Sequence, residues 1–427
     1  MEASFPHSRT SALESLATAL SIKKQYAFRR GFAIEERTTT LLSPLLRRKL
    51  VSEEEVLRAI VADFPSSTSA WESVEKLIQE VVWRIYWKGY LLRKPWIWEG
   101  YLKALRWFDQ SKDSTTELST IASLVERVIS GRSEISCINE WVRELRDTGY
   151  LHNHVRMWFA SIWIHTLKLP WELGARFFLE HLLDGDTAAN TLSWRWVAGL
   201  HTNGKTYLAS ADNIAKYTEG RVIVPPQVLA TLPNPGPSLP CPFATLPEKE
   251  EEKRIEAAAS SSSSPNNPFA LVLTHEDVAP DSFLPRGLVP TYVFILEPHY
   301  PQQHSVSEKV RNYDLNVLRD LKGRVAQELG SDRVFQVRDS EALTEIMKRC
   351  CPQSLLVPKI FCGPYQDLLT DIKAYASASN LSVHEASREV ERSLLPYAGR
   401  GFFPFWQKAE PLLRSYLADV SASERRG

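Results

Sequence analysis

The sequence predicts a protein of two folded parts, an all-helical N-terminal domain and a C-terminal α/β domain with a parallel, Rossmann-like sheet. In the first half, apolar residues recur at helical spacing, and twelve of the thirteen tryptophans precede residue 200. A stretch with ten of the 26 prolines, a charged run and a serine tract then separates the halves. After it, short β-type runs alternate with helical patterns. We therefore expect a helical domain over 1–224, a linker over 225–268 and an α/β domain over 269–420.

Five segments of the first half place apolar residues at i, i+3, i+4 and i+7, which is typical of amphipathic helices. They are LVSEEEVLRAIVADF (50–64), SVEKLIQEVVWRIYWKGYLL (73–92), SCINEWVRELRDTG (136–149), YLHNHVRMWFASIWIHTL (150–167) and PWELGARFFLEHLL (170–183). Ser52 before a glutamate run and Pro170 before an apolar run mark two helix starts. No alternating strand pattern competes with them.

The second half shows the period of strands. The predicted strands are ALVLT (270–274), TYVFIL (291–296), RVFQV (333–337), LLVPKI (355–360) and LSVH (381–384). Helical patterns lie between several of them, which favours a parallel sheet covered by helices. No glycine-rich dinucleotide fingerprint follows these strands, so the sequence predicts weak nucleotide binding there, or none.

Composition narrows the class of protein. With 51 basic and 51 acidic residues the chain is neutral, which excludes a generally basic nucleic-acid binder but leaves room for a local basic groove. The five cysteines form no CxxC pair, so we expect neither a disulfide scaffold nor a metal site, and a reducing compartment fits. The sequence has no signal peptide and no apolar run of about 20 residues. We expect a soluble intracellular protein, with the compartment left open.

Three helical segments place charged residues beside tryptophans. They are QEVVWRIYW (79–87), TGYLHNHVRM (148–157) and DGDTAANTLSWRW (184–196). Each alone has an ordinary explanation, since Glu80 and Arg84 at i,i+4 suit a surface pair, the indoles suit a core, and DGD suits a helix cap. Their co-occurrence favours a site, because buried charge is costly without a partner.

These segments resemble the FAD-binding helical domain of the deoxyribodipyrimidine photolyase and cryptochrome family. The matching pieces are TTTLLSPLL (38–46), QEVVWRIYW (79–87), TGYLHNHVRMWFAS (148–161), LPWELGARFF (169–178) and DGDTAANTLSWRW (184–196). They come in the family's order and span nearly all of residues 5–222. The resemblance implies FAD as the cofactor.

The resemblance also implies which residues contact the cofactor. They are Tyr26, Thr39, Thr40, Leu42, Ser43, Arg84, Asn153, Arg156, Asp184, Asp186 and Asn190. Among these, Arg156 and Asp184 match a buried ion pair, and Asn190 matches the residue that faces flavin N5. Photolyases carry an amide there, so Asn190 points to repair rather than signalling.

The implied reaction is blue-light-driven repair of cyclobutane pyrimidine dimers in DNA, a lyase reaction that uses an electron from reduced flavin. The residues that match the dimer slot are Glu80, Trp83, Asn153, Met157 and Trp196. A base flipped out of DNA needs flat apolar walls and a hydrogen-bonding group, which this set offers. The residues that match the catalytic and electron-transfer set are Glu80, Asn190, Trp194, Trp171 and, as the third tryptophan, Trp107 in preference to Trp98.

Departures from the family pattern leave two alternatives open. The α/β half resembles the family's antenna domain in a swapped, C-terminal place, and no residue in it marks a particular antenna chromophore. TYLASADNIAKY lacks an arginine expected to contact phosphate, which weakens DNA binding and favours single-stranded DNA. We expect a monomer that acts on dimer-containing DNA. The alternatives are a cryptochrome-like photoreceptor without repair and a non-catalytic flavoprotein whose α/β domain recruits a partner.

Overall fold

The protein is described here by a computed structural model. It describes residues 5–424 apart from 35–37, 63–67, 202–204, 234–238, 240–264, 266, 286, 299, 301–304, 360–362 and 364. Most of the predicted linker over 225–268, together with Cys241 and Cys362, lies outside the described residues.

The N-terminal region is helical, as predicted. Its α-helices are α1 (Arg9–Ala19), α2 (Tyr26–Arg29), α3 (Ser43–Arg47), α4 (Glu53–Val61), α5 (Thr68–Arg93), α6 (Trp96–Ser111), α7 (Thr116–Ile129), α8 (Ser136–Thr148), α9 (Asn153–Ser161), α10 (Trp171–His181), α11 (Thr187–Val197) and α12 (Ala211–Tyr217). The segment predicted as one helix over 150–167 begins instead at Asn153 and ends in a π-helical turn, Ile162–Thr166.

Local sequence explains where several helices begin and end. Ser52 accepts from the backbone N–H of Glu55, and the Glu55 carboxylate accepts from that of Ser52 at 2.8 Å, which is a capping box at the start of α4. Helix α8 ends at Gly149, whose φ of 70° is left-handed. Pro170 precedes α10, where a missing N–H costs nothing.

The second half contains the predicted parallel sheet. Its strands are β1 (Phe269–Leu273), β2 (Tyr292–Leu296), β3 (Val334–Val337), β4 (Ser354–Pro358) and β5 (Ser382–Ala386), in the order β3-β2-β1-β4-β5. Every neighbouring pair is parallel, with Val272 opposite Phe294 and Leu271 opposite Leu356. The helices are α13 (Glu308–Leu329), α14 (Ser340–Cys350), α15 (Tyr365–Ala378), α16 (Glu389–Leu394) and α17 (Phe402–Glu424).

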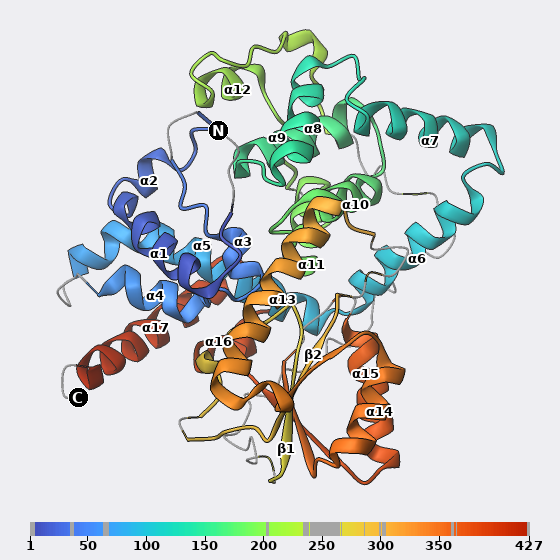
Figure 1. Cartoon of the computed structure of the whole chain (residues 1–427). Helices are drawn as coiled ribbons and strands as arrows, with labels where there is room; N and C mark the ends of the chain where they lie inside the picture. The colour runs from blue at the N-terminus through green and yellow to red at the C-terminus, as the bar shows by residue number, and fades with distance from the viewer. Residues whose placement is uncertain are drawn as a thin grey trace.

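The two faces of the sheet are buried against different partners. Alternate residues such as Val272 and Phe294 form a closed cluster with α14 and α15. The other alternate residues, such as Leu271 and Val293, join the core that continues into the helical region. Helix α13 connects the sheet to the helical region, because it packs on β2 and β3 and also on α10 (Figure 1). Successive side chains of a strand point to opposite faces, so one set packs against α14 and α15 and the other set packs against the core shared with the helical region.

Helix α17 returns to the helical region. It follows the sheet in the chain, within the predicted α/β domain over 269–420, yet it packs on α4, α5 and α16 (Figure 1). Its first turn inserts Phe402 and Trp406, both buried, beside α5. The apolar residues at its start therefore belong to the core of the first half.

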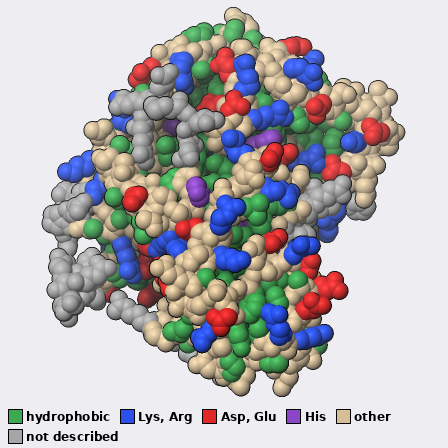
Figure 2. All heavy atoms as spheres, viewed as in Figure 1, with side chains coloured by type: hydrophobic (Ala, Val, Ile, Leu, Met, Phe, Trp, Pro, Cys, Tyr) green, Lys and Arg blue, Asp and Glu red, His purple; other side chains and the backbone are tan. Residues whose placement is uncertain are grey.

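The surface carries no single charged field on the face drawn in Figure 2. Lysine and arginine side chains alternate with aspartate and glutamate across it. This distribution agrees with the zero net charge of the chain. Within the described part of the chain, no helix combines the length and the apolar character that crossing a membrane requires.

Candidate functional site

A polar segment lies between α2 and α3 and faces α5. Leu42 is buried, whereas Thr39, Thr40 and Ser43 are half-buried. Arg84 on α5 donates from Nη2 to the Ser43 carbonyl at 3.3 Å. The segment therefore presents hydroxyls and a guanidinium on one side, a set that suits an anionic ligand.

Arg156 and Asp184 form a buried ion pair between α9 and the turn before α11. Nη2 of Arg156 lies 2.9 Å from Oδ2 of Asp184, and its Nε donates to the Leu151 carbonyl at 2.8 Å. Burial alone would raise the pKa of Asp184, but Arg156 outweighs it and holds the pKa below its usual range. Asp184 is therefore ionised in the folded protein, and the predicted ion pair is present.

Asp186 and Asn190 belong to the first turn of α11. Asp186 caps this helix by accepting from the Ala189 backbone N–H at 2.8 Å. Burial opposes its charge, yet Lys88 and Arg47 keep its pKa lowered. Nδ2 of Asn190 donates to the Ala175 carbonyl at 2.9 Å. With Nδ2 used in this way, the amide oxygen of Asn190 offers an acceptor to whatever lies beside it.

Tyr26 lies at the start of α2, and α2 packs on α5. Its ring is buried, and burial raises the pKa of its hydroxyl, with the Glu80 carboxylate adding to the effect. Tyr26 is therefore close to the helix that carries Glu80 and Arg84.

The predicted slot residues come from three helices, of which α11 packs on the other two, α5 and α9. Trp83, Met157 and Trp196 are each partly exposed. Nδ2 of Asn153 lies 4.0 Å from Sδ of Met157, and Asn153 is exposed. The structure thus brings the helices that bear these side chains together and leaves each side chain a free portion of surface.

Two of these side chains have partners that the sequence did not indicate. Phe402 of α17 stacks on the indole of Trp83, with ring centroids 3.7 Å apart and planes 6° from parallel. Trp196 stacks on Tyr207 at 5.8 Å. One face of Trp83 is therefore already covered, and a planar ligand can stack only on its other face.

Glu80 has an ionic partner, because Nη1 of Arg30 contacts its carboxylate. Burial raises the pKa of Glu80, and Arg30 opposes the shift without cancelling it. Arg30 stands in the basic run KKQYAFRR, the one sequence signal that would have drawn attention to it.

Two of the predicted electron-transfer tryptophans, Trp171 and Trp194, are buried, whereas Trp107 is partly exposed. Trp194 packs among Phe159, Trp163 and Phe178. Trp171 contacts Tyr101 at a centroid distance of 5.6 Å. Tyr101 in turn stacks on Trp98 at 5.2 Å.

Trp107 points elsewhere than this row of rings. It follows Trp98 by nine residues on α6, which is two and a half helical turns, so it lies on the opposite side of the helix. The contacts of Trp171 thus favour Trp98 over Trp107 as the third tryptophan. Spacing alone had left both open because the intervening Tyr101 carries no distinctive pattern.

A separate cavity lies between the carboxyl ends of the strands and the helical region. It contains about 810 Å³ of space not filled by atoms, and its walls include Lys88 and Asp186 on one side and Thr274, Leu296 and Val357 on the other. Carboxyl ends of parallel strands are a common place for ligands in open α/β sheets. No group of three or more potential metal ligands occurs among the residues with described positions.

Comparisons with known proteins agree with the predicted resemblance. Residues 77–222 match the family model described as the FAD binding domain of DNA photolyase. The chain is 27% identical over 188 residues to the deoxyribodipyrimidine photo-lyase of Salmonella typhimurium, which covers 43% of this chain and 37% of that protein. It is 26% identical over 182 residues to the cryptochrome DASH of Idiomarina loihiensis, covering 43% of this chain and 38% of that protein.

Solved structures give the same family names at low similarity. A class III photolyase from Agrobacterium tumefaciens is 24% identical, covers 49% of this chain and 42% of its own, and has a TM-score of 0.40. A cryptochrome from Synechocystis is 20% identical, covers 51% and 44%, and has a TM-score of 0.39. This chain therefore spans less than half the length of each of these relatives.

The residues present fit the cofactor named by the family model. Oδ1 of Asp184 is buried and has no hydrogen-bond partner among the residues described. A buried acceptor without a hydrogen bond lowers the stability of the folded protein, and FAD offers N–H and O–H donors that could supply this bond. Arg84 supplies positive charge for a diphosphate. The predicted resemblance is confirmed over residues 77–222, and FAD is the cofactor that the matched family model names.

Proposed function

Because residues 77–222 match the family model of the FAD binding domain of DNA photolyase, we propose that this protein uses FAD for light-driven repair of cyclobutane pyrimidine dimers in DNA. The observation that carries repair is Glu80, a half-buried carboxyl that lies one helical turn from Arg84 and beside the indole of Trp83 in the chain. Burial raises the pKa of Glu80 and so favours the protonated form over the charged one, although Arg30 opposes this shift. The protonated form can donate a hydrogen bond to a carbonyl oxygen as that oxygen gains negative charge.

The other predicted residues would hold the cofactor or contact the dimer. Arg84 with Thr39, Thr40, Leu42 and Ser43 would hold the cofactor's phosphate end, while Tyr26, Asn153, Arg156, Asp184, Asp186 and Asn190 would hold the rest. The free faces of Trp83 and Trp196 would each stack on a pyrimidine, worth about 1–3 kcal/mol per base, with Met157 filling the space between. A bound, reduced FAD would supply the light-driven electron-transfer chemistry that splits the cyclobutane ring.

The aromatic row from Trp98 through Tyr101 to Trp171, together with Trp194, would carry an electron inward when the cofactor is oxidised. The ring contacts at 5.6 Å and 5.2 Å support Trp98 rather than Trp107 as its outer member. Trp98→Phe should slow photoreduction of oxidised FAD, and Trp107→Phe should not. Transient absorption of the two variants measures this difference.

A cryptochrome-like photoreceptor without repair is the second candidate. Phe402 covers one face of Trp83, and the Arg30 guanidinium pairs with Glu80. Both contacts favour the photoreceptor, because a pyrimidine dimer would have to fit beside them or displace them. In this case the cofactor and the aromatic row keep their roles, and the α/β part passes on the signal.

A repair assay separates the candidates. The FAD-loaded, reduced protein is illuminated with blue light in the presence of dimer-containing oligothymidine, single-stranded and in duplex. We expect splitting, with the single strand preferred, by a protein that sediments as a monomer. Glu80→Ala should lower the yield at least about tenfold, because it removes a hydrogen bond to a charged group, which contributes about 1.5–3 kcal/mol. The exposed glutamate Glu72 on the same helix gives the control Glu72→Ala, which should change nothing.

The outcomes distinguish the candidates. FAD binding without splitting of either substrate contradicts repair and leaves the photoreceptor. Failure of the wild-type chain to retain FAD contradicts both. Equal loss of FAD and of splitting in Glu80→Ala would mean that Glu80 serves the cofactor pocket and not the dimer.

A further inference from the structure

We propose that Arg47 and Glu276 form a positioning bridge through which the α/β part holds the turn Asp184–Gly185–Asp186 of the cofactor pocket. The inference rests on the proposed FAD binding of this pocket. It assigns to the α/β part a direct effect on how tightly the helical region retains its cofactor.

Arg47, the last residue of α3, contacts both parts of the molecule. Its Nε donates to the Gly185 carbonyl at 2.9 Å. Its two Nη atoms contact the two carboxylate oxygens of Glu276, which follows β1, and the Nη2–Oε1 distance is 2.5 Å. The Arg47 side chain is only 7% exposed. One planar guanidinium thus joins a carboxylate of the α/β part to a backbone carbonyl of the helical region.

The carbonyl that Arg47 holds lies at the centre of the pocket's polar set. Gly185 separates Asp184, the partner of Arg156, from Asp186, the cap of α11. Helix α11 carries Asn190. A displacement of the Gly185 peptide would therefore move both carboxylates and the start of the helix that bears the amide.

Glu276 holds both Nη atoms of Arg47. Burial lowers the pKa of Arg47, but nearby carboxylates, Glu276 and Asp186 among them, raise it above its usual range. Without Glu276, a carboxylate that still acts on Arg47, Asp186, belongs to the pocket itself. The buried guanidinium would then turn toward Asp186 and compete with its capping bond to Ala189, because a buried charge requires a partner.

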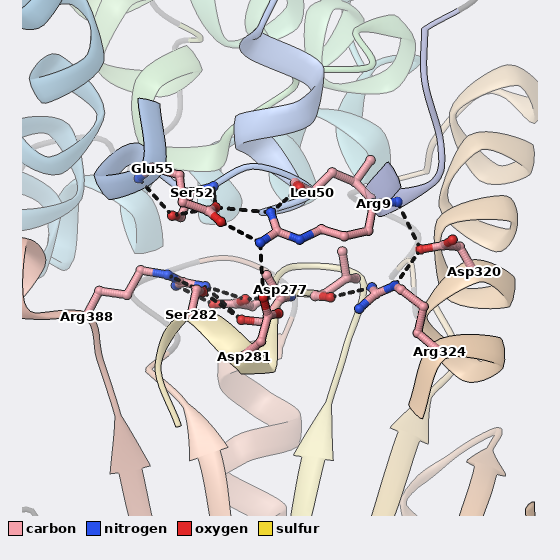
Figure 3. Close-up of polar contacts among 12 residues, drawn as sticks. Arg9, Leu50, Ser52, Glu55, Asp277, Asp281, Ser282, Asp320, Arg324 and Arg388 are labelled. Carbon is pink, nitrogen blue, oxygen red and sulfur yellow. Dashed lines mark hydrogen bonds and ion pairs between the residues drawn. The ribbon is translucent and has the colours of Figure 1, made fainter. Parts of the chain in front are cut away.

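Two neighbouring ion pairs between the two parts involve no residue of this turn. Arg48 pairs with Asp314 and Lys49 with Glu391, both across the same boundary. Figure 3 shows a further contact of this kind, in which Arg9 of α1 lies against Asp281 at 3.0 Å and against Glu55. Asp281 thus offers a control carboxylate, because it binds a helical-region arginine without touching the turn.

The test compares Glu276→Gln, Arg47→Lys and Asp281→Asn in the full-length chain. Lysine keeps the charge opposite Glu276 but has no second, planar donor for Gly185. FAD is titrated into each apoprotein and followed by quenching of flavin fluorescence. We expect Glu276→Gln and Arg47→Lys each to raise the Kd for FAD about tenfold, and Asp281→Asn to change it less than about twofold.

A second measurement does not depend on the cofactor. Hydrogen exchange of the apoprotein over 182–190 reports the turn directly, since the amides of Gly185 and Asn190 donate to Leu182 and Asp186. Exchange there should quicken in Glu276→Gln and Arg47→Lys and stay unchanged in Asp281→Asn. Similar exchange in all three variants, or equal loss of FAD in all three, would overturn the bridge. A wild-type chain that binds no FAD would instead overturn the proposed function. The hydrogen-exchange result would still test whether Arg47 and Glu276 hold the turn.

Discussion

Gly174 lies on α10 where the indole of Trp194 crosses it, so Gly174→Ala tests how closely these two helices are packed. A Cβ atom built on Gly174 would lie 2.3 Å from Cη2 and 2.6 Å from Cζ3 of Trp194, and 3.0 Å from Cε2 of Trp163. Carbon atoms in ordinary contact are about 3.5–4.0 Å apart. The indole or the helix must therefore move by about 1 Å.

Neither ring can move freely. Trp194 is 2% exposed and enclosed by aromatic neighbours, and Trp163 donates from Nε1 to the Pro170 carbonyl at 2.9 Å. Overpacking of this kind costs about 1–3 kcal/mol. Alanine is favoured over glycine inside a helix by about 1 kcal/mol, which offsets part of this cost. We expect Gly174→Ala to lower the free energy of unfolding by up to about 2 kcal/mol.

Gly323 supplies the matched control. It lies inside α13, and a Cβ atom there would meet nothing within 4 Å. Gly323→Ala should therefore stabilise the protein by about 0.5–1 kcal/mol. Thermal unfolding followed by circular dichroism should lower the Tm of Gly174→Ala and raise that of Gly323→Ala, and Gly174→Ala should also slow photoreduction of FAD. An increase of Tm in both variants would refute the packing argument.

The remaining predictions concern a helix cap, an acid transition and a buried ion pair. Ser52→Ala removes the capping box of α4 and should cost about 1 kcal/mol in urea unfolding, whereas an unchanged midpoint would mean that the cap is redundant. Burial lowers the pKa of His275 to about 4. Because its unfolded pKa is about 6.5, stability should fall as pH drops from about 6.5 toward 4, by about 3 kcal/mol in all. His275→Gln should flatten that slope in unfolding measured against pH, and an unchanged slope would assign the transition to other groups. Arg156→Met leaves the buried carboxylate of Asp184 unpaired and should cost about 3 kcal/mol, the lower end of the usual range because Arg156 is 22% exposed. A loss below about 1 kcal/mol in urea unfolding would show that Asp184 takes up a proton instead.

Much of the fold was predictable because the signals are local. The capping residues Ser52 and Pro170 mark the helix starts they predicted, and the five β-type runs form the five strands with shifts of one or two residues. Their common parallel direction followed from the helices between them. The π-helical turn at 162–166 was not predictable, because an apolar run at helical spacing does not reveal an extra residue in one turn.

The candidate site was predictable only as far as its motifs extend. Arg156 and Asp184 are 28 residues apart, and their pairing could be inferred from the resemblance because both lie inside matched motifs. Arg30 on Glu80 and Phe402 on Trp83 could not be inferred in this way. Phe402 is more than 300 residues from Trp83 in the chain, in a segment outside the matched region.

By itself, the sequence determined the helical and parallel-sheet halves, the resemblance of the first half to a photolyase FAD binding domain, and the residues that match its pocket. These depend on periodicity and on short motifs, which are properties of neighbouring residues. The tertiary structure alone decided which face of Trp83 is free, which tryptophan Tyr101 connects to Trp171, and that Arg47 joins the cofactor turn to Glu276. These are contacts between side chains far apart in the chain, and their existence depends on how α17, α6 and the loop after β1 pack against the helical region.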